Sequence, residues 1–197
     1  MRYALLSFFA IFLLLSCGQG LIQQSESNEY FTEQYSVRKK DNVKHGPYKK
    51  YTLDGGLVEE GEYVDGTIEG ARKKFENGRL FAIETISDGK FHGLYQSFYP
   101  DGSPNSVGNY ENDEMVGVWK RYYRNGQLME EVSFEGNLEN GPFKEYYENG
   151  NIKAEGHYLD GDKEHGELRL YNEKGVLIRK MNCDRGICKT TWELEKD

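Results

Sequence analysis

Two cysteines near the end of the chain are the residues best placed for covalent chemistry. Cys183 and Cys188 stand in the stretch Cys-Asp-Arg-Gly-Ile-Cys. A turn at residues 184–186 would bring them near the Cα separation of about 5.5 Å that a disulfide needs, and such bonds persist outside the cytoplasm. Free thiols are the alternative, whereas zinc is disfavoured because no second Cys or His pair has suitable spacing. We expect a disulfide that holds the last hairpin.

The histidines and carboxylates do not predict a reaction centre. His45, His92 and His165 each precede a recurring glycine, and His157 and His165 could approach each other across a hairpin connection, although exposed side chains are the favoured interpretation. The sequence holds no G-x-S-x-G elbow, phosphate-binding loop or H-E-x-x-H motif, and its carboxylates are scattered. We therefore expect no enzyme, no catalytic residue, no metal and no cofactor.

Glycines at a nearly constant interval organise the chain. The steps between them are 24, 23, 24, 24 and 25 residues, and an aromatic residue follows each one by five positions. A fixed period of this size predicts a tandem array of one stacked unit. The repeat glycines are Gly46, Gly70, Gly93, Gly117, Gly141 and Gly166, and the repeat aromatics are Tyr51, Phe75, Phe98, Tyr122, Tyr146 and Tyr171.

Each repeat carries the signals of a β-hairpin. Asp-Gly or Asn-Gly pairs, such as Asp54-Gly55 and Asn125-Gly126, separate two runs rich in Tyr, Phe, Val, Ile and Leu. These pairs supply the positive φ of tight turns. Further turn signals, such as Asp65-Gly66, join the hairpins into a meander. The predicted fold class is all-β, with about six hairpin repeats of about 24 residues forming an elongated, twisted antiparallel sheet.

Aromatic rings are expected to supply the core. Gly61, Gly108 and Gly156 leave holes in one face of the second strands, and a neighbouring ring can lie over each hole. With fifteen tyrosines and ten phenylalanines in the chain, we predict that the repeat aromatics form a continuous buried stack. The first strands leave two possibilities, because Phe143 and Tyr146 have opposite parity and point to opposite faces unless a bulge intervenes.

The repeats also resemble a known family. Units such as HGPYKKYTLDGGLVEEGEYVDG and NGPFKEYYENGNIKAEGHYLDG resemble the MORN-repeat variant of bacterial proteins in the YwqK-like antitoxin family. The resemblance covers about residues 45–183; it implies stacked β-hairpins, a role in neutralising a toxin, and no catalytic residues. Two repeats depart from the pattern, since Arg72 replaces an aromatic residue and Pro104 replaces the usual Leu or Ile.

The first sixteen residues predict a secretory signal. Arg2 precedes an apolar run from Tyr3 to Leu15, which is shorter than the about 20 residues that span a bilayer. The run ends Leu-Leu-Ser-Cys17, which resembles the bacterial lipobox, where the cysteine is lipidated after cleavage. We predict a lipoprotein signal peptide at residues 1–16 and lipidation of Cys17. The alternative is an ordinary signal peptide whose cysteine is coincidental.

Composition predicts the remaining boundaries. The stretch 17–34 is rich in Gln, Ser, Asn and Glu, which is typical of a flexible tether after the lipidated cysteine. Residues 35–188 hold the repeat array, and residues 189–197 form a C-terminal edge strand with a charged tail.

The charge balance limits the possible partners. With 33 acidic and 25 basic residues the net charge is −8, which argues against nucleic acid and against docking to an anionic bilayer surface. The exception is a set of cations three residues after the repeat glycines. These either form a basic ladder on one face or are solvated residues offset by nearby glutamates; they are Lys49, Lys73, Lys120, Lys144 and Arg169.

Three functions fit these features. The first is a lipid-anchored protein of the bacterial cell envelope, at the outer membrane or periplasmic face, whose repeats are a non-catalytic scaffold for a protein or peptide partner. The second is a toxin-neutralising antitoxin or immunity protein, as the resemblance implies. The third is a periplasmic glycan-binding or enzyme-accessory protein. We expect the first, with membrane attachment through the lipid and no nucleic-acid partner.

Overall fold

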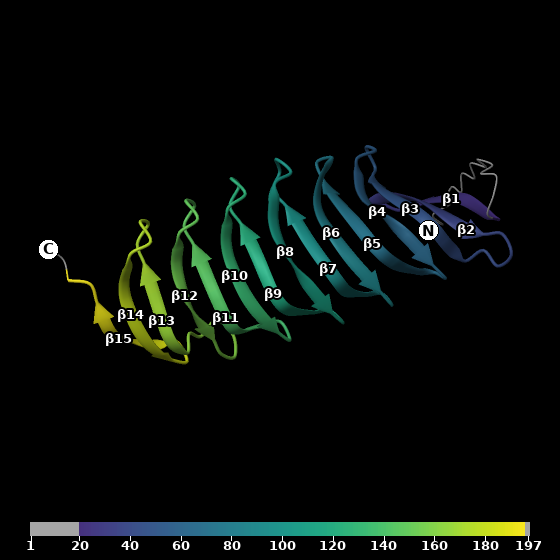
Figure 1. The fold of residues 1–197 in the computed structure, drawn as a ribbon. Coiled ribbons are helices and arrows are strands. Elements are labelled where there is room, and N and C mark those ends of the chain that lie inside the picture. The colour runs from purple at the N-terminus through teal and green to yellow at the C-terminus, as the bar shows by residue number, and fades with distance from the viewer. Residues whose placement is uncertain (1–19, 196–197) are drawn as a thin grey trace, which may run out of the picture. The chain divides into compact units, whose positions relative to one another are not determined.

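The computed structural model describes residues 20–195. The regular elements of this part of the chain are all β-strands, which confirms the all-β prediction, and no helix within it is long and apolar enough to cross a membrane. The chain divides into two compact units, Met1–Gly89 and Lys90–Asp197, and each is described by itself. Within each unit successive strands are antiparallel neighbours in chain order (Figure 1). The predicted signal peptide and the lipidation site Cys17 lie outside the described residues.

The strands form a meander of hairpins in both units. The described part of the first unit contains β1 (Leu21–Ser27), β2 (Phe31–Arg38), β3 (Lys44–Thr52), β4 (Leu57–Val64), β5 (Thr67–Glu76) and β6 (Arg79–Ser87). That of the second contains β7 (Lys90–Phe98), β8 (Pro104–Glu111), β9 (Glu114–Tyr122), β10 (Leu128–Glu135), β11 (Leu138–Tyr146), β12 (Ile152–Tyr158), β13 (Gly166–Tyr171), β14 (Leu177–Asp184) and β15 (Ile187–Glu193). The six predicted hairpin repeats therefore run from β3–β4 to β13–β14.

Of the six repeat glycines, four lie at bulges inside the first strand of their repeat, where the register against the preceding strand shifts; they are Gly46, Gly70, Gly117 and Gly141. All six have a φ between 67° and 108°, a region that glycine enters without strain. At Gly46, for example, the register of β2 against β3 shifts so that Ser36 faces residues 45–47. A bulge bends its strand and re-aims the side chains that follow. The repeat period therefore reflects the recurrence of this bulge.

The Asn-Gly and Asp-Gly pairs form the hairpin turns, as predicted. Asn77 and Gly78 both have positive φ, 50° and 74°, which is the type I′ turn with two connecting residues. In the first repeat Gly55 has a φ of 92°, and the register shifts between Lys50 and Tyr51. This corresponds to a longer turn followed by a glycine bulge. In the second repeat the Asn-Gly pair begins seven residues after the repeat glycine, whereas the pair of the first repeat begins eight residues after it. The shorter turn explains this difference.

The residue two positions after the repeat glycine builds the core. Tyr48 is 2% exposed, Trp119 8% and Phe143 3%. In each unit the side chains at this position lie on one face of the sheet, which we call the aromatic face. Tyr146 lies three residues after Phe143 and points to the other face. The register shift near the turn adds a residue to β12 and none to β11, so side chains keep alternating between the faces from Phe143 to Tyr146.

The prediction that the repeat aromatics form the buried stack is therefore wrong. Positions two and five after the glycine lie on opposite faces of a strand whose side chains alternate. All six repeat aromatics are half-buried on the face opposite the core; they are Tyr51, Phe75, Phe98, Tyr122, Tyr146 and Tyr171.

Glycines of the second strands lie under aromatic rings, which confirms the predicted covering of holes. A Cβ added at Gly156 would lie 3.0 Å from Cε1 of Phe143, and one added at Gly108 would overlap the indole ring of Trp119. Gly61 is covered in the same way by the ring of the first repeat. Each of these glycines lets a large ring pack directly on the backbone of the sheet.

We expect Gly108→Ala to destabilise the second unit by about 1–3 kcal/mol, because the new methyl group displaces the Trp119 ring from a packed position. Gly156→Ala should cost less, since its methyl group meets Phe143 at 3.0 Å. Urea unfolding of both variants measures the two changes. A larger loss for Gly156→Ala would contradict the placement of Trp119 over Gly108.

Residues 20–34 are not the flexible tether that composition predicts. β1 pairs with β2 along its whole length. Ile22 packs against a buried cluster of Tyr35, Val37 and Tyr48. The described array therefore begins at Leu21 rather than at residue 35, because one apolar side chain and a complete strand pairing suffice to dock this segment.

Lys44 of β3 holds β1 and β2 against the repeat array. Its Nζ donates hydrogen bonds to Glu26 at 3.1 Å and to Glu33 at 2.7 Å, and lies 3.9 Å from the centroid of the Tyr35 ring. Burial alone would raise the pKa of Glu33, but the hydrogen bonds from Lys44 and Tyr63 lower it below its ordinary value. Glu26 and Glu33, which have the composition of a linker, thus form ion pairs with Lys44 in the folded sheet.

The last strand begins at Ile187, two residues before the predicted boundary. Arg185 and Gly186 form a turn of positive φ between β14 and β15. Cys183 and Cys188 are direct cross-strand partners and are joined in a disulfide, with their Cα atoms 3.9 Å apart. The turn has two residues instead of the predicted three, which makes the two cysteines direct partners across the hairpin.

Candidate interaction face

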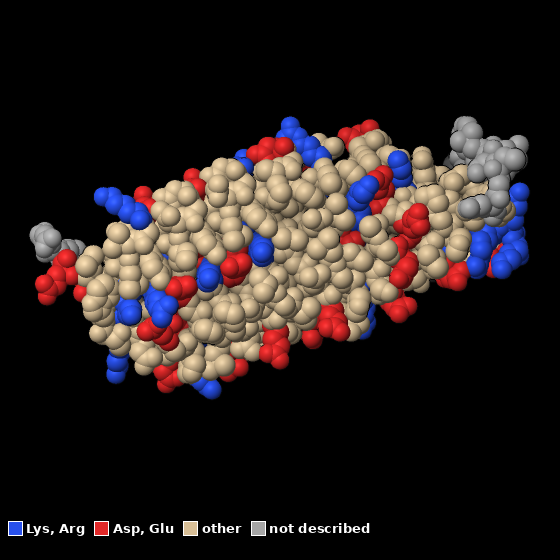
Figure 2. All heavy atoms as spheres, in the orientation of Figure 1, with Lys and Arg blue, Asp and Glu red and all other residues tan. Residues whose placement is uncertain are grey.

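The face opposite the core carries a row of charged residues, and we call it the ladder face. In the second unit, neighbouring members of the row are direct partners on adjacent strands. The row runs through Lys120, Glu131, Lys144, Glu155, Arg169 and Lys180. Figure 2 shows basic and acidic atoms alternating over the region that Figure 1 labels β9 to β14.

The predicted cations are offset by glutamates. Glu155 lies 4.0 Å from Lys144 and 3.4 Å from Arg169, on the two strands beside it. Glu60 bridges the corresponding lysines of β3 and β5 in the first unit. Of the two possibilities that the sequence left open, these contacts match the second, in which the cations are solvated residues offset by nearby glutamates. Opposite charges that face each other across strands contribute about 0.2–1 kcal/mol each.

Two of the repeat aromatics hold the glutamates of this row. The Tyr146 hydroxyl donates to Glu131 at 3.0 Å, and the Tyr171 hydroxyl donates to Glu155 at 2.7 Å. Burial and the bond to Glu131 raise the pKa of Tyr146 to about 12. The Tyr171 bond lowers the pKa of Glu155 against the effect of burial, with help from Arg169. Tyr146 and Tyr171 thus position charges, although they do not form the core.

The lysines of the row are more accessible than its glutamates. The side chains of Lys120 and Lys144 are each 44% exposed, whereas those of Glu131 and Glu155 are 28% and 22% exposed. The two ion pairs span 3.9 Å and 4.0 Å, so the ammonium groups are loosely held. The ladder face therefore presents cations to solvent and keeps its anions close to the sheet.

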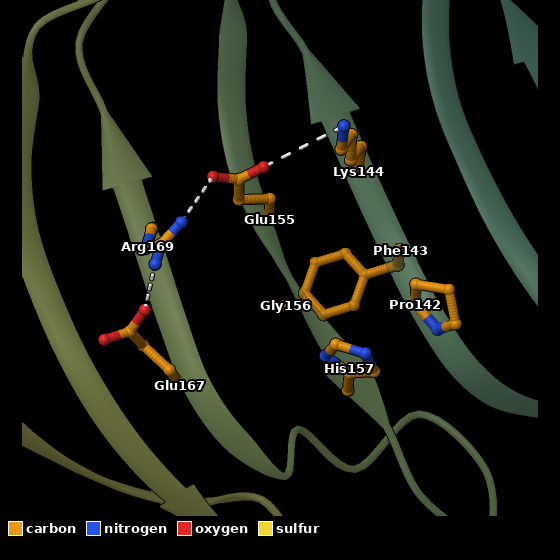
Figure 3. Close-up of a pocket in the computed structure, with 8 residues that line it drawn as sticks. All are labelled: Pro142, Phe143, Lys144, Glu155, Gly156, His157, Glu167 and Arg169. Atoms are coloured by element: carbon orange, nitrogen blue, oxygen red, sulfur yellow. Dashed lines mark hydrogen bonds and ion pairs between the residues drawn. The ribbon is translucent and has the colours of Figure 1, made fainter.

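A shallow depression of about 320 Å³ opens on the ladder face over β11 to β13 (Figure 3). Pro142 and Lys144 border it on one strand and Arg169 on another, with Glu155 reaching toward both cations. Gly156 has no side chain and exposes backbone there. These groups can receive polar side chains of a partner.

The first unit holds a depression built in the same way, of about 220 Å³. Its proline, lysine, glutamate and second cation occupy the same repeat positions as those of the second unit. They are Pro47, Lys49, Glu60 and Lys73. The repeat thus reproduces a surface feature as well as a core.

The histidines lie outside any metal cluster in the described residues, where no group of three or more His, Cys, Asp or Glu side chains is placed to hold an ion. His45 Nδ1 lies 3.5 Å from Asp65, and His165 Nδ1 lies 3.5 Å from Asp184. Both pairs are exposed at hairpin connections. His157 borders the depression over β11 to β13.

A second row of tyrosines links neighbouring repeats of the second unit, and sequence reasoning missed it. Each stands one position after a repeat aromatic and donates its hydroxyl hydrogen to the backbone carbonyl of the next repeat aromatic. The bonds are Tyr99 to Tyr122 at 2.7 Å, Tyr123 to Tyr146 at 2.7 Å and Tyr147 to Tyr171 at 2.8 Å. We call these three donors the bridging tyrosines. The doubled aromatics in SFYPDG, RYYRNG and EYYENG were the signal.

We expect Tyr123→Phe to destabilise the second unit by about 1 kcal/mol, because it removes one hydrogen bond and leaves a partly buried carbonyl without its donor. Tyr30→Phe is the matched control, since Tyr30 is 63% exposed and should change stability little. Urea unfolding followed by circular dichroism compares the two. Equal midpoints would show that the bridge does not stabilise the array.

Four segments of the chain match the MORN repeat variant family, at residues 44–65, 91–112, 115–135 and 139–160. The chain carries MORN-variant repeats. The matched segments are the first, third, fourth and fifth repeats, and the second and sixth share their hairpin architecture. No match was found among curated proteins.

The two repeats without a match to this family differ from the others at the core position. The second has Arg72 and the sixth has Leu168 where the four matched repeats have an aromatic side chain. The bulge glycine and both strands are nevertheless present in each. The backbone repeat therefore extends beyond the part that sequence similarity detects.

Proposed function

We propose that this chain is a lipid-anchored protein of the bacterial cell envelope whose MORN-variant repeats form a non-catalytic scaffold for a protein partner. The scaffold role is supported by the ladder face, which is patterned and exposed while the core lies on the opposite face. MORN repeats are commonly protein or membrane interaction modules. Stacked repeats offer long surfaces of this kind. The envelope location is supported by the Leu-Leu-Ser-Cys17 motif of the sequence.

Cross-linking tests the scaffold role. The full-length chain, tagged at its C terminus, is cross-linked in cells and purified, and captured proteins are identified by mass spectrometry. The double variant Lys120→Glu/Lys144→Glu reverses two exposed charges of the ladder face. Lys163→Glu/Lys174→Glu makes the same change at exposed hairpin connections and is the control.

We expect the ladder variant to lose the proteins that the wild type captures, and the control to retain them. The proposal fails if both variants capture the same proteins as the wild type. It also fails if the wild type captures nothing beyond what an unrelated tagged envelope protein captures.

Fractionation of Cys17→Ser tests the anchor separately. Lipid attachment gives stable membrane association when two or more acyl chains are present. The variant should accumulate as an unprocessed precursor or leave the membrane fraction. An unchanged mass and an unchanged membrane fraction would exclude lipidation at Cys17.

The toxin-neutralising role is the second candidate, and the resemblance of the units to the YwqK-like family supports it. It requires that the cross-linked partner be toxic when produced alone and harmless when produced with this chain. Glycan binding ranks third. The Tyr146 and Tyr171 hydroxyls are bonded to glutamates, and the rings are half-buried, which leaves little ring surface for a sugar.

A further inference from the structure

One exposed position of the repeat is apolar in five of the six copies. It directly follows the repeat glycine and lies on the ladder face, and all six side chains are exposed. The six residues are Pro47, Ala71, Leu94, Val118, Pro142 and Glu167. Single exposed apolar residues are normal on any protein surface. Their recurrence at one exposed position of an array is a pattern that core packing does not explain.

In the second unit this position forms an apolar stripe of Leu94, Val118 and Pro142. Val118 is 52% exposed and Leu94 is 45% exposed. The three residues lie on every second strand, so consecutive members are about 10 Å apart, since adjacent strands are about 4.8 Å apart. Their direct partners on the intervening strands are polar, namely Asn109, Ser133 and His157.

Solvent-facing lysines accompany the stripe. Lys120 and Lys144 follow Val118 and Pro142 by two positions on the same strands, which places them about 6.6 Å further along. Their glutamate partners are less exposed and lie 3.9 Å and 4.0 Å away. Tyrosine hydroxyls already bind those glutamates. A partner on this face therefore meets an apolar row beside a row of accessible cations.

We propose that an acidic amphipathic α-helix of a partner protein lies across the strands of the second unit, with its apolar side on Leu94, Val118 and Pro142. This proposal rests on the scaffold function and specifies the kind of partner. Seven residues of helix advance about 10.5 Å, which matches the spacing of the stripe. Apolar side chains seven residues apart stay on one side of a helix. Glutamates beside them reach Lys120 and Lys144.

The width of a helix favours it over an extended partner. A helix with side chains is about 10 Å across and covers both rows, which are about 6.6 Å apart. A polyproline II segment advances about 9.3 Å every three residues, but it is narrower and covers one row. An anionic membrane surface is disfavoured, because the chain has a net charge of −8 and the stripe lacks the aromatic residues that enter lipid.

Fluorescence anisotropy with a designed peptide tests the proposal. The probe is a labelled alanine-based helix of about 21 residues, with leucine at every seventh position and glutamates beside each leucine. The protein is the full-length chain in detergent. We expect saturable binding that weakens by about tenfold or more in Val118→Glu and in Lys144→Glu, since the first replaces an apolar contact by an anion and the second reverses the charge of a cation. Val176→Glu is the matched control, because Val176 is 45% exposed in a hairpin turn, and it should bind as the wild type does.

Several results would overturn the helix proposal. They are no binding of the acidic peptide, equal binding of a peptide whose leucines are moved out of the seven-residue spacing, and unchanged binding by Val118→Glu. Tighter binding of a peptide with proline at every third position, or of anionic lipid vesicles, also overturns it. If the peptide fails while cross-linking still loses its partners in Lys120→Glu/Lys144→Glu, the scaffold function stands and the helical partner is wrong.

Discussion

Replacing Trp119 by alanine is expected to destabilise the second unit by about 3–5 kcal/mol, the usual cost of truncating a buried aromatic side chain. Trp119 is 8% exposed. Its indole ring covers Gly108 and meets the rings of Tyr110 and Phe134 edge-on, with centroids 5.2 Å and 6.1 Å away. Its Nε1 donates to the carbonyl of Asn109 at 3.2 Å. Alanine would leave a cavity among several rings at once.

Two control variants isolate the effect of burial. Trp192→Ala removes the same side chain from β15, where it is 42% exposed, and should stay within about 0.5–1 kcal/mol. Tyr122→Ala truncates a half-buried repeat aromatic and should fall between the two. Urea unfolding followed by far-ultraviolet circular dichroism measures all three. Equal losses for Trp119→Ala and Tyr122→Ala would show that the aromatic face is not the core.

The hairpins were predictable because their signals are local. Asn77-Gly78 and similar pairs determine turn geometry within a few residues, and alternating strands such as Leu57–Val64 follow directly. The buried aromatic row was not predictable in the same way. Both Trp119 and Tyr122 recur with the repeat period, so periodicity alone cannot choose between them. The choice depends on the bulge at the repeat glycine, which sets the face of every later residue.

The packing of β1 and β2 against β3 could not be predicted from the sequence for a related reason. Glu26 and Glu33 look like linker residues when counted by composition. They become partners of Lys44 only when three strands lie side by side. Composition cannot distinguish a polar linker from a polar strand whose partners come from elsewhere in the chain.

Only the cations of the candidate site could be predicted from the sequence. The spacing of Lys120 and Lys144 from the repeat glycines predicts a row on one face. The placement of Glu131 beside both requires the register of neighbouring strands. The bridging tyrosines reach carbonyls 23 or 24 residues away. Donor and acceptor of each bond are therefore about one repeat length apart in the sequence. Every pair of equivalent positions in neighbouring repeats has the same separation, so this spacing alone does not identify the hydrogen bond.

The second repeat offers the sharpest test of what the core position requires. There Arg72 and Glu84 are direct partners in place of an aromatic ring and its glycine. Arg72 Nε donates to Glu84 at 2.7 Å, Lys74 lies 3.7 Å from the same carboxylate, and Glu84 is 5% exposed. Removing one partner of a buried ion pair typically costs about 3–5 kcal/mol, because the remaining charge stays buried. We therefore expect Arg72→Met to destabilise the first unit by about this amount.

The double variant Arg72→Tyr/Glu84→Gly recreates the pair that Tyr48 and Gly61 form in the first repeat. It should recover most or all of the lost stability, because replacing a whole buried ion pair by well-packed apolar groups is often neutral or stabilising. Lys49→Met is the control for simple charge loss, since Lys49 is 53% exposed and should change stability by less than about 1 kcal/mol. Urea unfolding of the four proteins gives the comparison. If the double variant is as unstable as Arg72→Met, the ion pair is not interchangeable with the ring and glycine, and the second repeat depends on its charges for more than filling the core position.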